Sequence, residues 1–199
     1  MDSPDFLRLL NKYRDGAPTV ISAGQRSRQF LTMAGDDPLV MYSMDFPYAT
    51  PICLGLARAS GLKKVVALEG DGNVVAGLCN LTTIARYQPE NLVVAICDNE
   101  SFGSFQTGSI GSATGAGVDL ASVARSCGIV NACTVRDLAE ADDVLRRAFS
   151  EPGPWVVVAK VRNVGDTDSR FWTYQLDIVE NGFGFKQSLR STLAAVQPG

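Results

Sequence analysis

The chain has 199 residues, of which 46% are hydrophobic and 20% are charged, and its formal net charge is −3. This composition is typical of a globular protein with a sizeable core, and the small net charge argues against nucleic acid or an anionic membrane surface as the main partner. No apolar run approaches the roughly 18 residues of a membrane span, and charges interrupt every turn of the N-terminal segment, so a secretory signal is not expected.

Short apolar runs alternate with helical patterns along the chain. Helices are predicted for residues 4–14, 25–34, 49–60, 74–87, 119–127 and 137–149. Strands are predicted for residues 18–22, 38–42, 63–70, 91–97, 128–135 and 154–161. Near-continuous Val, Ile and Leu in the strands indicates burial on both faces, so the pattern predicts an α/β fold, a doubly wound parallel sheet with helices on both faces. Ligands of such folds bind beyond the carboxyl ends of the strands.

Two segments fall outside this alternation. Residues 98–118 contain five glycines and are predicted to form a long loop at the carboxyl edge of the sheet. A loop of that length at that edge is usually functional. Residues 163–199 are too rich in aromatic side chains for a free linker, so this C-terminal tail is expected to pack over the domain or over a partner. We interpret residues 1–199 as a single domain that ends in this tail.

Cysteine and histidine limit the chemistry that this chain can perform. None of the five cysteines forms a C-x-x-C pair, which indicates reduced thiols in a cytoplasmic protein and argues against zinc or iron–sulfur ligation. Histidine is absent, so a Ser-His-Asp or Cys-His arrangement within this chain is excluded. Acid–base chemistry must therefore come from carboxylates, a cofactor or another chain.

Polar residues follow two of the predicted strands. Asp71 lies between Gly70 and Gly72 at the end of the 63–70 strand, and Asn99 follows the 91–97 strand. The simplest interpretation is a pair of turns, since Gly, Asp and Asn are common turn residues. The alternative is a shared Mg²⁺ site, because neighbouring parallel strands end at the same edge and Mg²⁺ prefers oxygen ligands. The glycines would then let a phosphate approach the backbone near the start of a helix.

The spacing of these motifs carries a family resemblance. "GDGN" at 70–73 and "DNESFG" at 98–103 are similar to the thiamine-diphosphate signature, in which Gly-Asp-Gly and a later Asn are separated by a spacer of similar length. The flanking stretches "PICLGLARAS", "NLTTIARYQPENLVVAIC" and "GVDLASVARSCGI" resemble thiamine-diphosphate-dependent 2-oxo acid decarboxylases, namely the sulfopyruvate and phosphonopyruvate decarboxylases. The likeness covers about residues 40–161.

The resemblance implies a role for each matching position. The Mg²⁺ ligands would be the side chains of Asp71 and Asn99 and the backbone carbonyl of Ser101. Phe46 would be the apolar wedge that bends the cofactor, with simple core packing as its alternative. The Met44 carbonyl would face the aminopyrimidine ring. The other cofactor-binding positions would be Gly70, Gly72, Asn73, Phe102 and Gly103, and the substrate contacts would be Gln106 and Thr107.

The sequence departs from the family at two places. In "MDFP" (44–47) Phe replaces the usual Met and two glycines are lost, so the register of this segment is open. Relatives often carry a Thr-His-Thr-like stretch where this chain has "SFQTGSIGSATG". The substrate can therefore differ from sulfopyruvate.

The resemblance also implies that the site is shared between chains. In the family, a glutamate from a separate pyrimidine-binding domain assists the loss of the cofactor's C2 proton. This chain has room only for the diphosphate-binding domain, so no catalytic residue is assigned to it. The implied assembly is a hetero-oligomer, α2β2 or larger, in which the partner supplies that glutamate and the complex decarboxylates a small 2-oxo acid.

Some residues and functions stay open at this stage. Glu69 is either a charge at a helix end or a cofactor contact, Glu100 points either into the site or to solvent, and Asp98 is interpreted as orienting the loop. A carboligase that forms a C–C bond after decarboxylation remains an alternative. A non-catalytic stabilising subunit is opposed by the intact Asp71 and Asn99. The absence of cysteine pairs argues against a subunit of an oxo-acid:ferredoxin oxidoreductase. The absence of histidine argues against a transketolase-type subunit.

Overall fold

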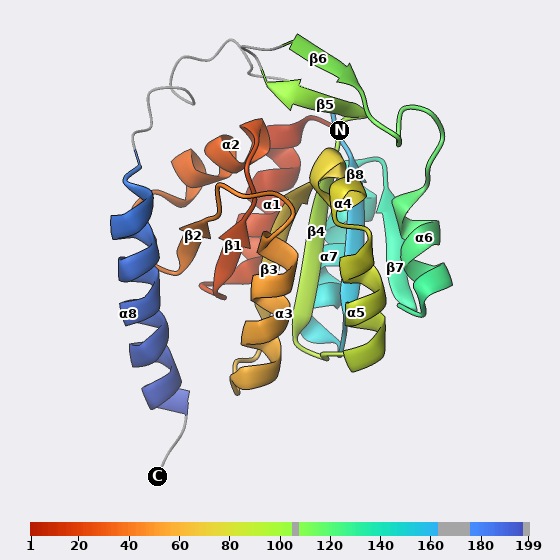
Figure 1. Ribbon diagram of the computed structural model, residues 1–199. Helices are drawn as coiled ribbons and strands as arrows, with labels where there is room; N and C mark the ends of the chain where they lie inside the picture. The colour runs from red at the N-terminus through yellow and green to blue at the C-terminus, as the bar shows by residue number, and fades with distance from the viewer. Residues whose placement is uncertain (105–107, 163–175, 197–199) are drawn as a thin grey trace.

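The computed structural model describes residues 1–104, 108–162 and 176–196. Its centre is a six-stranded sheet in the order β2-β1-β3-β4-β8-β7, in which every neighbouring pair is parallel. A separate antiparallel hairpin projects from one end of the sheet (Figure 1). The sheet strands are β1 Thr19–Ile21, β2 Val40–Tyr42, β3 Val65–Gly70, β4 Leu92–Asp98, β7 Asn131–Val135 and β8 Trp155–Lys160, and the hairpin strands are β5 Ser101–Ser104 and β6 Gly108–Gly111.

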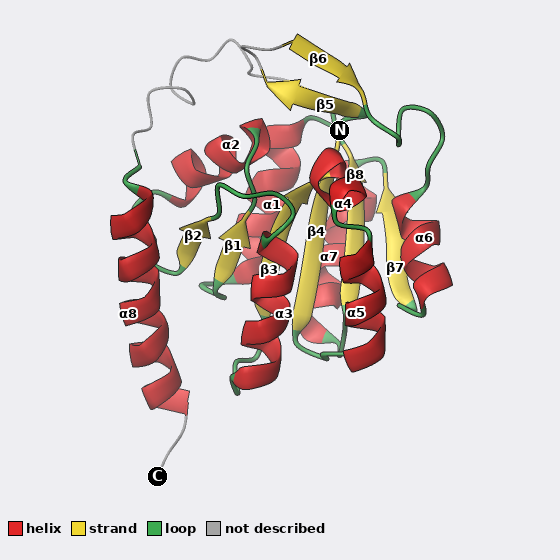
Figure 2. Cartoon of the chain, viewed as in Figure 1, coloured by secondary structure: helices red, strands yellow, loops and turns green. Residues whose placement is uncertain are grey.

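Helices cover both faces of this sheet (Figure 2), which confirms the predicted doubly wound α/β fold. One core cluster joins the sheet to α1 Ser3–Arg14, α2 Gln25–Ala34 and α7 Leu138–Ser150. The other joins it to α3 Ala49–Ala59, α5 Cys79–Tyr87, α6 Leu120–Cys127 and α8 Ile178–Val196. No helix among the described ranges is long and apolar enough to cross a membrane.

Strand β3 shows why the sequence folds this way. Val65 and Ala67 pack into one core cluster, whereas Val66 and Leu68 pack into the other. Successive side chains of a strand point to opposite faces, so a strand buried on both sides needs an unbroken apolar run. Burying each of the larger side chains stabilises the fold by about 1.5–3 kcal/mol relative to exposure.

The predicted helix 74–87 is wrong in its start and its continuity. The structure has α4 Asp71–Ala76 and α5 instead, separated at Gly77. A Cβ atom on Gly77 would lie 2.4 Å from two atoms of the Pro47 ring, so a glycine is needed where the segment 46–48 crosses the helix. Asp71 and Gly72 therefore lie in the first turn of a helix and not in a preceding turn.

The loop predicted for 98–118 is also wrong in part, because β4 runs on to Asp98 and the hairpin β5–β6 occupies part of the segment. Phe102 pairs with Ile110 across this hairpin. The glycines in the segment hid the pairing, since glycine is depleted in strands.

Within the expected tail, the described residues include a 19-residue helix, α8, which lies beside the outer strand β2 (Figure 1). Phe185 of α8 is buried in the core. The Asn181 side chain donates to the carbonyl of Val40 and accepts from the amide of Tyr42, both at 2.9 Å. An amide side chain thus satisfies backbone groups that an edge strand leaves unpaired.

The strand order places a crevice at one end of the sheet. β1 pairs with β2 on one side and with β3 on the other, so the order in which strands are added to the sheet reverses between β1 and β3. Beyond the carboxyl ends of strands at such a switch point, α/β sheets bind their ligands. β3 also pairs directly with β4, with Gly70 opposite Cys97, which brings the two predicted motifs to the same edge.

Candidate functional site

A cavity of about 320 Å³ lies at this switch point. Such a volume is within the usual range of small-molecule sites. Three segments that follow β1, β3 and β4 line it, together with Phe46. The lining residues are Ala23, Gly24, Gln25, Arg26, Ser27, Phe46, Gly70, Asp71, Gly72, Asn73, Cys97, Asn99, Ser101 and Phe102.

Most of the predicted cofactor residues meet at this cavity. Gly70 ends β3, Asp71, Gly72 and Asn73 form the first turn of α4, and Asn99, Ser101 and Phe102 come from the segment after β4. Met44 does not line it, and Gly103 lies in strand β5. Gln106 and Thr107 lie outside the described residues.

One wall of the cavity was not predicted from the sequence. Gly24 precedes α2 with a φ of 142°, a conformation that favours glycine, and the first turn of α2 faces the cavity. Arg26 is buried there and donates to Ser3 Oγ at 2.7 Å and to Gln29 Oε1 at 3.0 Å. The amides of a first helical turn favour anions, so this wall suits a phosphate group. A glycine between a predicted strand and a predicted helix was the available signal.

Asp71 is 1% exposed and is held by two hydroxyl groups. Ser112 Oγ donates to Asp71 Oδ2, and Thr114 Oγ1 lies 3.0 Å from the same oxygen. Burial is the main cause that raises the pKa of the Asp71 carboxyl above its ordinary value. The hydrogen bond from Ser112 opposes this rise, and the charge of Asp98 adds to it.

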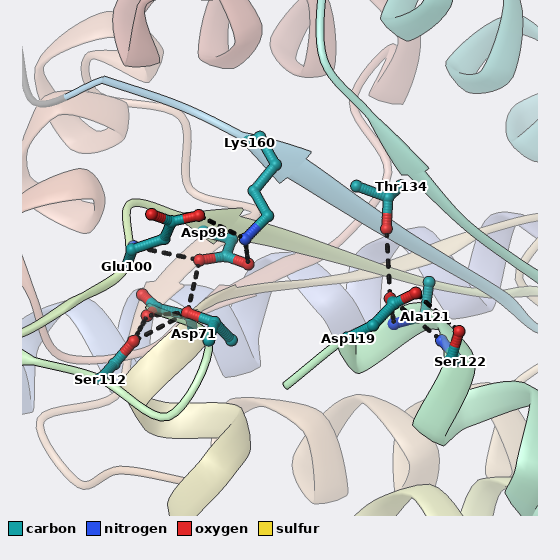
Figure 3. Close-up of polar contacts among 10 residues, drawn as sticks. Asp71, Asp98, Glu100, Ser112, Asp119, Ala121, Ser122, Thr134 and Lys160 are labelled. Atoms are coloured by element: carbon teal, nitrogen blue, oxygen red, sulfur yellow. Dashed lines mark hydrogen bonds and ion pairs between the residues drawn. The ribbon is translucent and has the colours of Figure 1, made fainter. Parts of the chain in front are cut away.

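Asp98 anchors the turn that follows β4. It is 1% exposed, accepts from the Glu100 amide at 3.1 Å, and forms an ion pair with Lys160 at 2.8 Å. Lys160 also pairs with Glu100 at 2.9 Å, and Figure 3 shows these three side chains together beside Asp71. Burial by itself would lower the pKa of Lys160, but the hydrogen bonds to Asp98 and Glu100 outweigh it and raise that pKa. The Glu100 side chain is 54% exposed and does not line the cavity.

The turn itself is strained at Glu100. This residue has a φ of 59°, in the left-handed region, which costs a residue with a side chain about 1–2 kcal/mol. The Ser112 amide donates to the Glu100 carbonyl at 3.1 Å and fixes the following peptide group. Asn99 and Ser101 flank Glu100 and both line the cavity. The surroundings therefore hold the two expected ligand positions in one conformation.

The aromatic side chains at the cavity lie close to the glycine motif. A Cβ atom on Gly72 would lie 1.9 Å from Phe102 Cδ2, so the ring occupies the space beside this glycine. Phe46 meets Phe102 edge to face, with ring centroids 5.7 Å apart. Phe46 is 48% exposed and is therefore not a simple core residue. At Gly70 the nearest atom is 3.9 Å from a built Cβ, which leaves ordinary contact space.

Asn73 and Glu69 connect the segments around the cavity. Asn73 Nδ2 donates to Ser22 Oγ at 2.5 Å and to the Ala23 carbonyl at 2.8 Å, which joins α4 to the end of β1. Glu69 is 2% exposed, and its Oε1 accepts from the amide and the hydroxyl of Thr50 at 3.0 and 2.9 Å in the first turn of α3. Burial raises the pKa of this carboxyl. Glu69 is thus a buried carboxyl group at the start of α3, and it does not line the cavity.

The oxygen-rich lining can be compared with the needs of a metal and a diphosphate. The described residues contain no group of three or more His, Cys, Asp or Glu side chains that could hold a metal. A cation here would instead use the Asp71 carboxylate, the Asn99 amide oxygen and a backbone carbonyl. Mg²⁺ accepts this set, because it takes few protein oxygens and completes its shell with water and phosphate. The residues present therefore fit Mg²⁺ and a phosphate group.

The sequence is similar to a known family and to known proteins. Residues 23–159 match the family described as "Thiamine pyrophosphate enzyme, C-terminal TPP binding domain". The chain is 32% identical over 114 residues to sulfopyruvate decarboxylase subunit beta of Methanocaldococcus jannaschii, covering 54% of this chain and 59% of that protein. It is 33% identical over 160 residues to phosphonopyruvate decarboxylase of Streptomyces viridochromogenes, covering 78% of this chain and 38% of that enzyme.

A comparison with solved structures supports the fold. Benzoylformate decarboxylase from Polynucleobacter necessarius superposes with a TM-score of 0.63 at 17% identity, over 79% of this chain and 33% of that one. At this identity the match shows a shared fold alone. The chain spans less than two thirds of the two sequence relatives and of this structure.

Proposed function

The chain belongs to the thiamine pyrophosphate (thiamine diphosphate) enzymes as their C-terminal cofactor-binding domain, and from this premise we propose a role as one subunit of a heteromeric 2-oxo acid decarboxylase. In this role it binds Mg²⁺ and the diphosphate of the cofactor. The observation that supports the proposal most strongly is that Asp71, Asn99 and Ser101 line one cavity with the first turns of α2 and α4.

Each wall of the cavity has a task in this proposal. The side chains of Asp71 and Asn99 and the Ser101 carbonyl would hold Mg²⁺. Gly72 and Asn73 of α4, with the first turn of α2, would bind the diphosphate through backbone amides. Phe46 and Phe102 would pack against the apolar part of the cofactor and exclude water. When bound, thiamine diphosphate supplies the electron sink that decarboxylation of a 2-oxo acid requires.

A partner chain completes the site in this proposal. The Methanocaldococcus jannaschii relative is named as a subunit, and the Streptomyces relative is a longer protein of which this chain matches 38%. Met44, Phe46 and Tyr48 are 58%, 48% and 55% exposed in one short segment next to the cavity. Exposed apolar patches usually mark an interaction site. We assign this patch to a pyrimidine-binding-domain subunit that carries the activating glutamate, in an α2β2 or larger assembly.

Two functions from the same site remain as alternatives. A carboligase would use the same cofactor and metal ligands but would add the product to an acceptor. The choice between them depends on substrate contacts, and the proposed ones, Gln106 and Thr107, lie outside the described residues. A non-catalytic subunit would predict no metal-dependent cofactor binding.

The free cysteines suit a reducing compartment, so we place the complex in the cytoplasm.

The test is reconstitution with the partner that co-purifies from the native source. The complex should decarboxylate at least one compound in a panel of 2-oxo acids, in a Mg²⁺-dependent manner, and this chain alone should show negligible turnover. Asp71→Ala should reduce the activity of the complex to background while the chain stays folded, because one metal ligand is lost.

Asp119→Ala is the matched control for this variant. Asp119 is also a carboxylate held by hydroxyl and amide donors, but it caps α6 away from the cavity (Figure 3). Its loss should cost about 1 kcal/mol of stability without changing the Mg²⁺ requirement. Full activity of the Asp71→Ala complex at ordinary Mg²⁺ concentrations would contradict the metal assignment.

A further inference from the structure

A buried polar chain runs from Asp71 through Thr114 and Asp98 to Lys160, and it includes hydroxyl residues that lie outside the two motifs. Thr114 is 4% exposed, and its Oγ1 lies 3.0 Å from Asp71 Oδ2 and 2.8 Å from Asp98 Oδ1. Ser112 Oγ lies 2.8 Å from the Thr114 hydroxyl and donates to Asp71. Lys160 closes the chain at the Asp98 end. One hydroxyl thus joins the two buried carboxylates at the ends of β3 and β4.

The number of hydroxyl protons limits the hydrogen bonds that this cluster can form. A hydroxyl has one proton to donate and two lone pairs to accept with. Ser112 donates to Asp71, and the single Thr114 proton is shared between Asp71 Oδ2 and Asp98 Oδ1, while Lys160 balances the charge of Asp98. Buried carboxylates are costly unless charges and hydrogen bonds compensate them. The arrangement holds Asp98 firmly, and Thr114 then fixes the distance between Asp98 and Asp71.

The segment that carries Thr114 is anchored to the turn after β4. The Ser112 amide donates to the Glu100 carbonyl at 3.1 Å, and the Gly115 amide donates to the Ser112 carbonyl at 3.1 Å. A Cβ atom on Gly115 would lie 3.0 Å from the Glu100 carbonyl oxygen, so the two turns pack closely. Thr114 therefore contacts Asp71 from a segment that is itself fixed to the turn holding Asn99 and Ser101.

We propose that Thr114, backed by the Asp98–Lys160 ion pair, is a positioning residue that sets the Asp71 carboxylate in place for a divalent cation. The inference rests on the proposed function, because Asp71 must be a metal ligand for its orientation to matter. Thr114 touches neither the reacting atoms nor the metal. Its effect is on the metal affinity, since groups that orient metal ligands typically contribute about 10–100-fold to that affinity.

The experiment measures Mg²⁺ binding by calorimetry in the assembled complex with thiamine diphosphate present. Thr114→Val keeps the shape of the side chain and removes the hydroxyl, so its dissociation constant for Mg²⁺ should rise about 10–100-fold. Thr114→Ser keeps the hydroxyl and should stay near the wild-type value. At saturating Mg²⁺ the Thr114→Val complex should recover most of its kcat, because the residue acts on metal binding alone.

Thr134→Val is the matched control. Thr134 also places a hydroxyl 3.5 Å from a carboxylate, that of Asp119, and the pair lies at the right of Figure 3, away from the residues that line the cavity. Its Mg²⁺ affinity should equal that of the wild type. If Thr114→Val fails to fold, Lys160→Met replaces it, with Lys160→Arg as the variant that should restore affinity.

The possible results separate this inference from the proposed function. Wild-type Mg²⁺ affinity in Thr114→Val, together with lost affinity in Asp71→Ala, would overturn the positioning role and leave the metal site intact. Unchanged affinity in Asp71→Ala would overturn the proposed metal site. A fall in thermal stability of Thr114→Val without a change in Mg²⁺ affinity would show a purely structural residue and would also overturn the inference.

Discussion

The carboxyl ends of β3 and β4 and the flank where α8 covers β2 both bury polar groups, but they satisfy them differently. At the flank, the Asn181 amide pairs with the edge-strand backbone at two points, and neutral groups satisfy one another. At the strand ends, two carboxylates that are each 1% exposed share the hydroxyl of Thr114. Neutral groups that pair completely with one another serve only to stabilise the fold. Two neighbouring buried carboxylates, in contrast, suit a site that binds a cation.

The extent of the family match follows the same division. The matching residues 23–159 contain Asp71, Asp98 and Thr114, whereas α8 lies beyond them. Changes at the strand ends should therefore alter cofactor binding, and changes at the flank should alter stability alone. Three predictions test this division, and the first should show the largest effect.

Gly72→Ala should damage the strand ends most. Its Cβ would lie 1.9 Å from Phe102 Cδ2, so the ring or the hairpin must shift. We expect the free energy of unfolding to fall by about 1–3 kcal/mol and cofactor binding to weaken strongly. Chemical denaturation and a cofactor titration of the complex measure the two effects. Gly111→Ala, where a built Cβ meets nothing within 4 Å, is the control. Equal behaviour of both variants would show that Phe102 yields easily.

Asn181→Ala should affect only the flank. The variant leaves the Val40 carbonyl and the Tyr42 amide without the side chain that pairs with them. An unsatisfied buried group costs about 1–3 kcal/mol, so the thermal midpoint should fall while Mg²⁺-dependent cofactor binding stays unchanged. Gln187→Ala on the exposed face of α8 should change neither quantity. A loss of cofactor affinity in Asn181→Ala would break the division between the two regions.

The thiol of Cys97 offers the mildest probe, because it requires no substitution. Cys97 lines the cavity but is buried, and desolvation raises its pKa to about 12. Alkylation requires the thiolate, so Cys97 should resist iodoacetamide in the folded chain and react only after denaturation. Cys79 is exposed and should react first. Mass spectrometry of the peptides gives the order, and rapid labelling of Cys97 would show that the strand ends open readily.

The sequence predicted the sheet well because burial leaves a direct mark on it. The apolar runs of β3 and β4 identified two central strands, and the motifs after them were expected at one edge, where the structure has them. The same pattern could not locate α4 or the β5–β6 hairpin. Glycine disfavours both helix and strand, so glycine-rich segments give no periodic signal.

The residues that support the site were harder to predict. Ser112 and Thr114 lie 41 and 43 positions from Asp71 in the chain, and short hydroxyl residues have no characteristic spacing. Lys160 is the last residue of the apolar strand β8, and a charged residue at a strand end is usually interpreted as exposed to solvent. These contacts depend on how the hairpin folds back over the strand ends, which is a tertiary property. Sequence motifs predict the residues that contact a ligand. The residues that orient those contacts are found only from the folded structure.

The central claim is that the ends of β3 and β4 bind a divalent cation together with the cofactor diphosphate. The most direct measurement is anomalous diffraction from crystals of the assembled complex that contain thiamine diphosphate and Mn²⁺ in place of Mg²⁺. We expect one strong Mn²⁺ peak bound by Asp71, Asn99 and the Ser101 carbonyl, and no such peak in the Asp71→Ala complex. A peak at other residues, or an unchanged peak in Asp71→Ala, would contradict it.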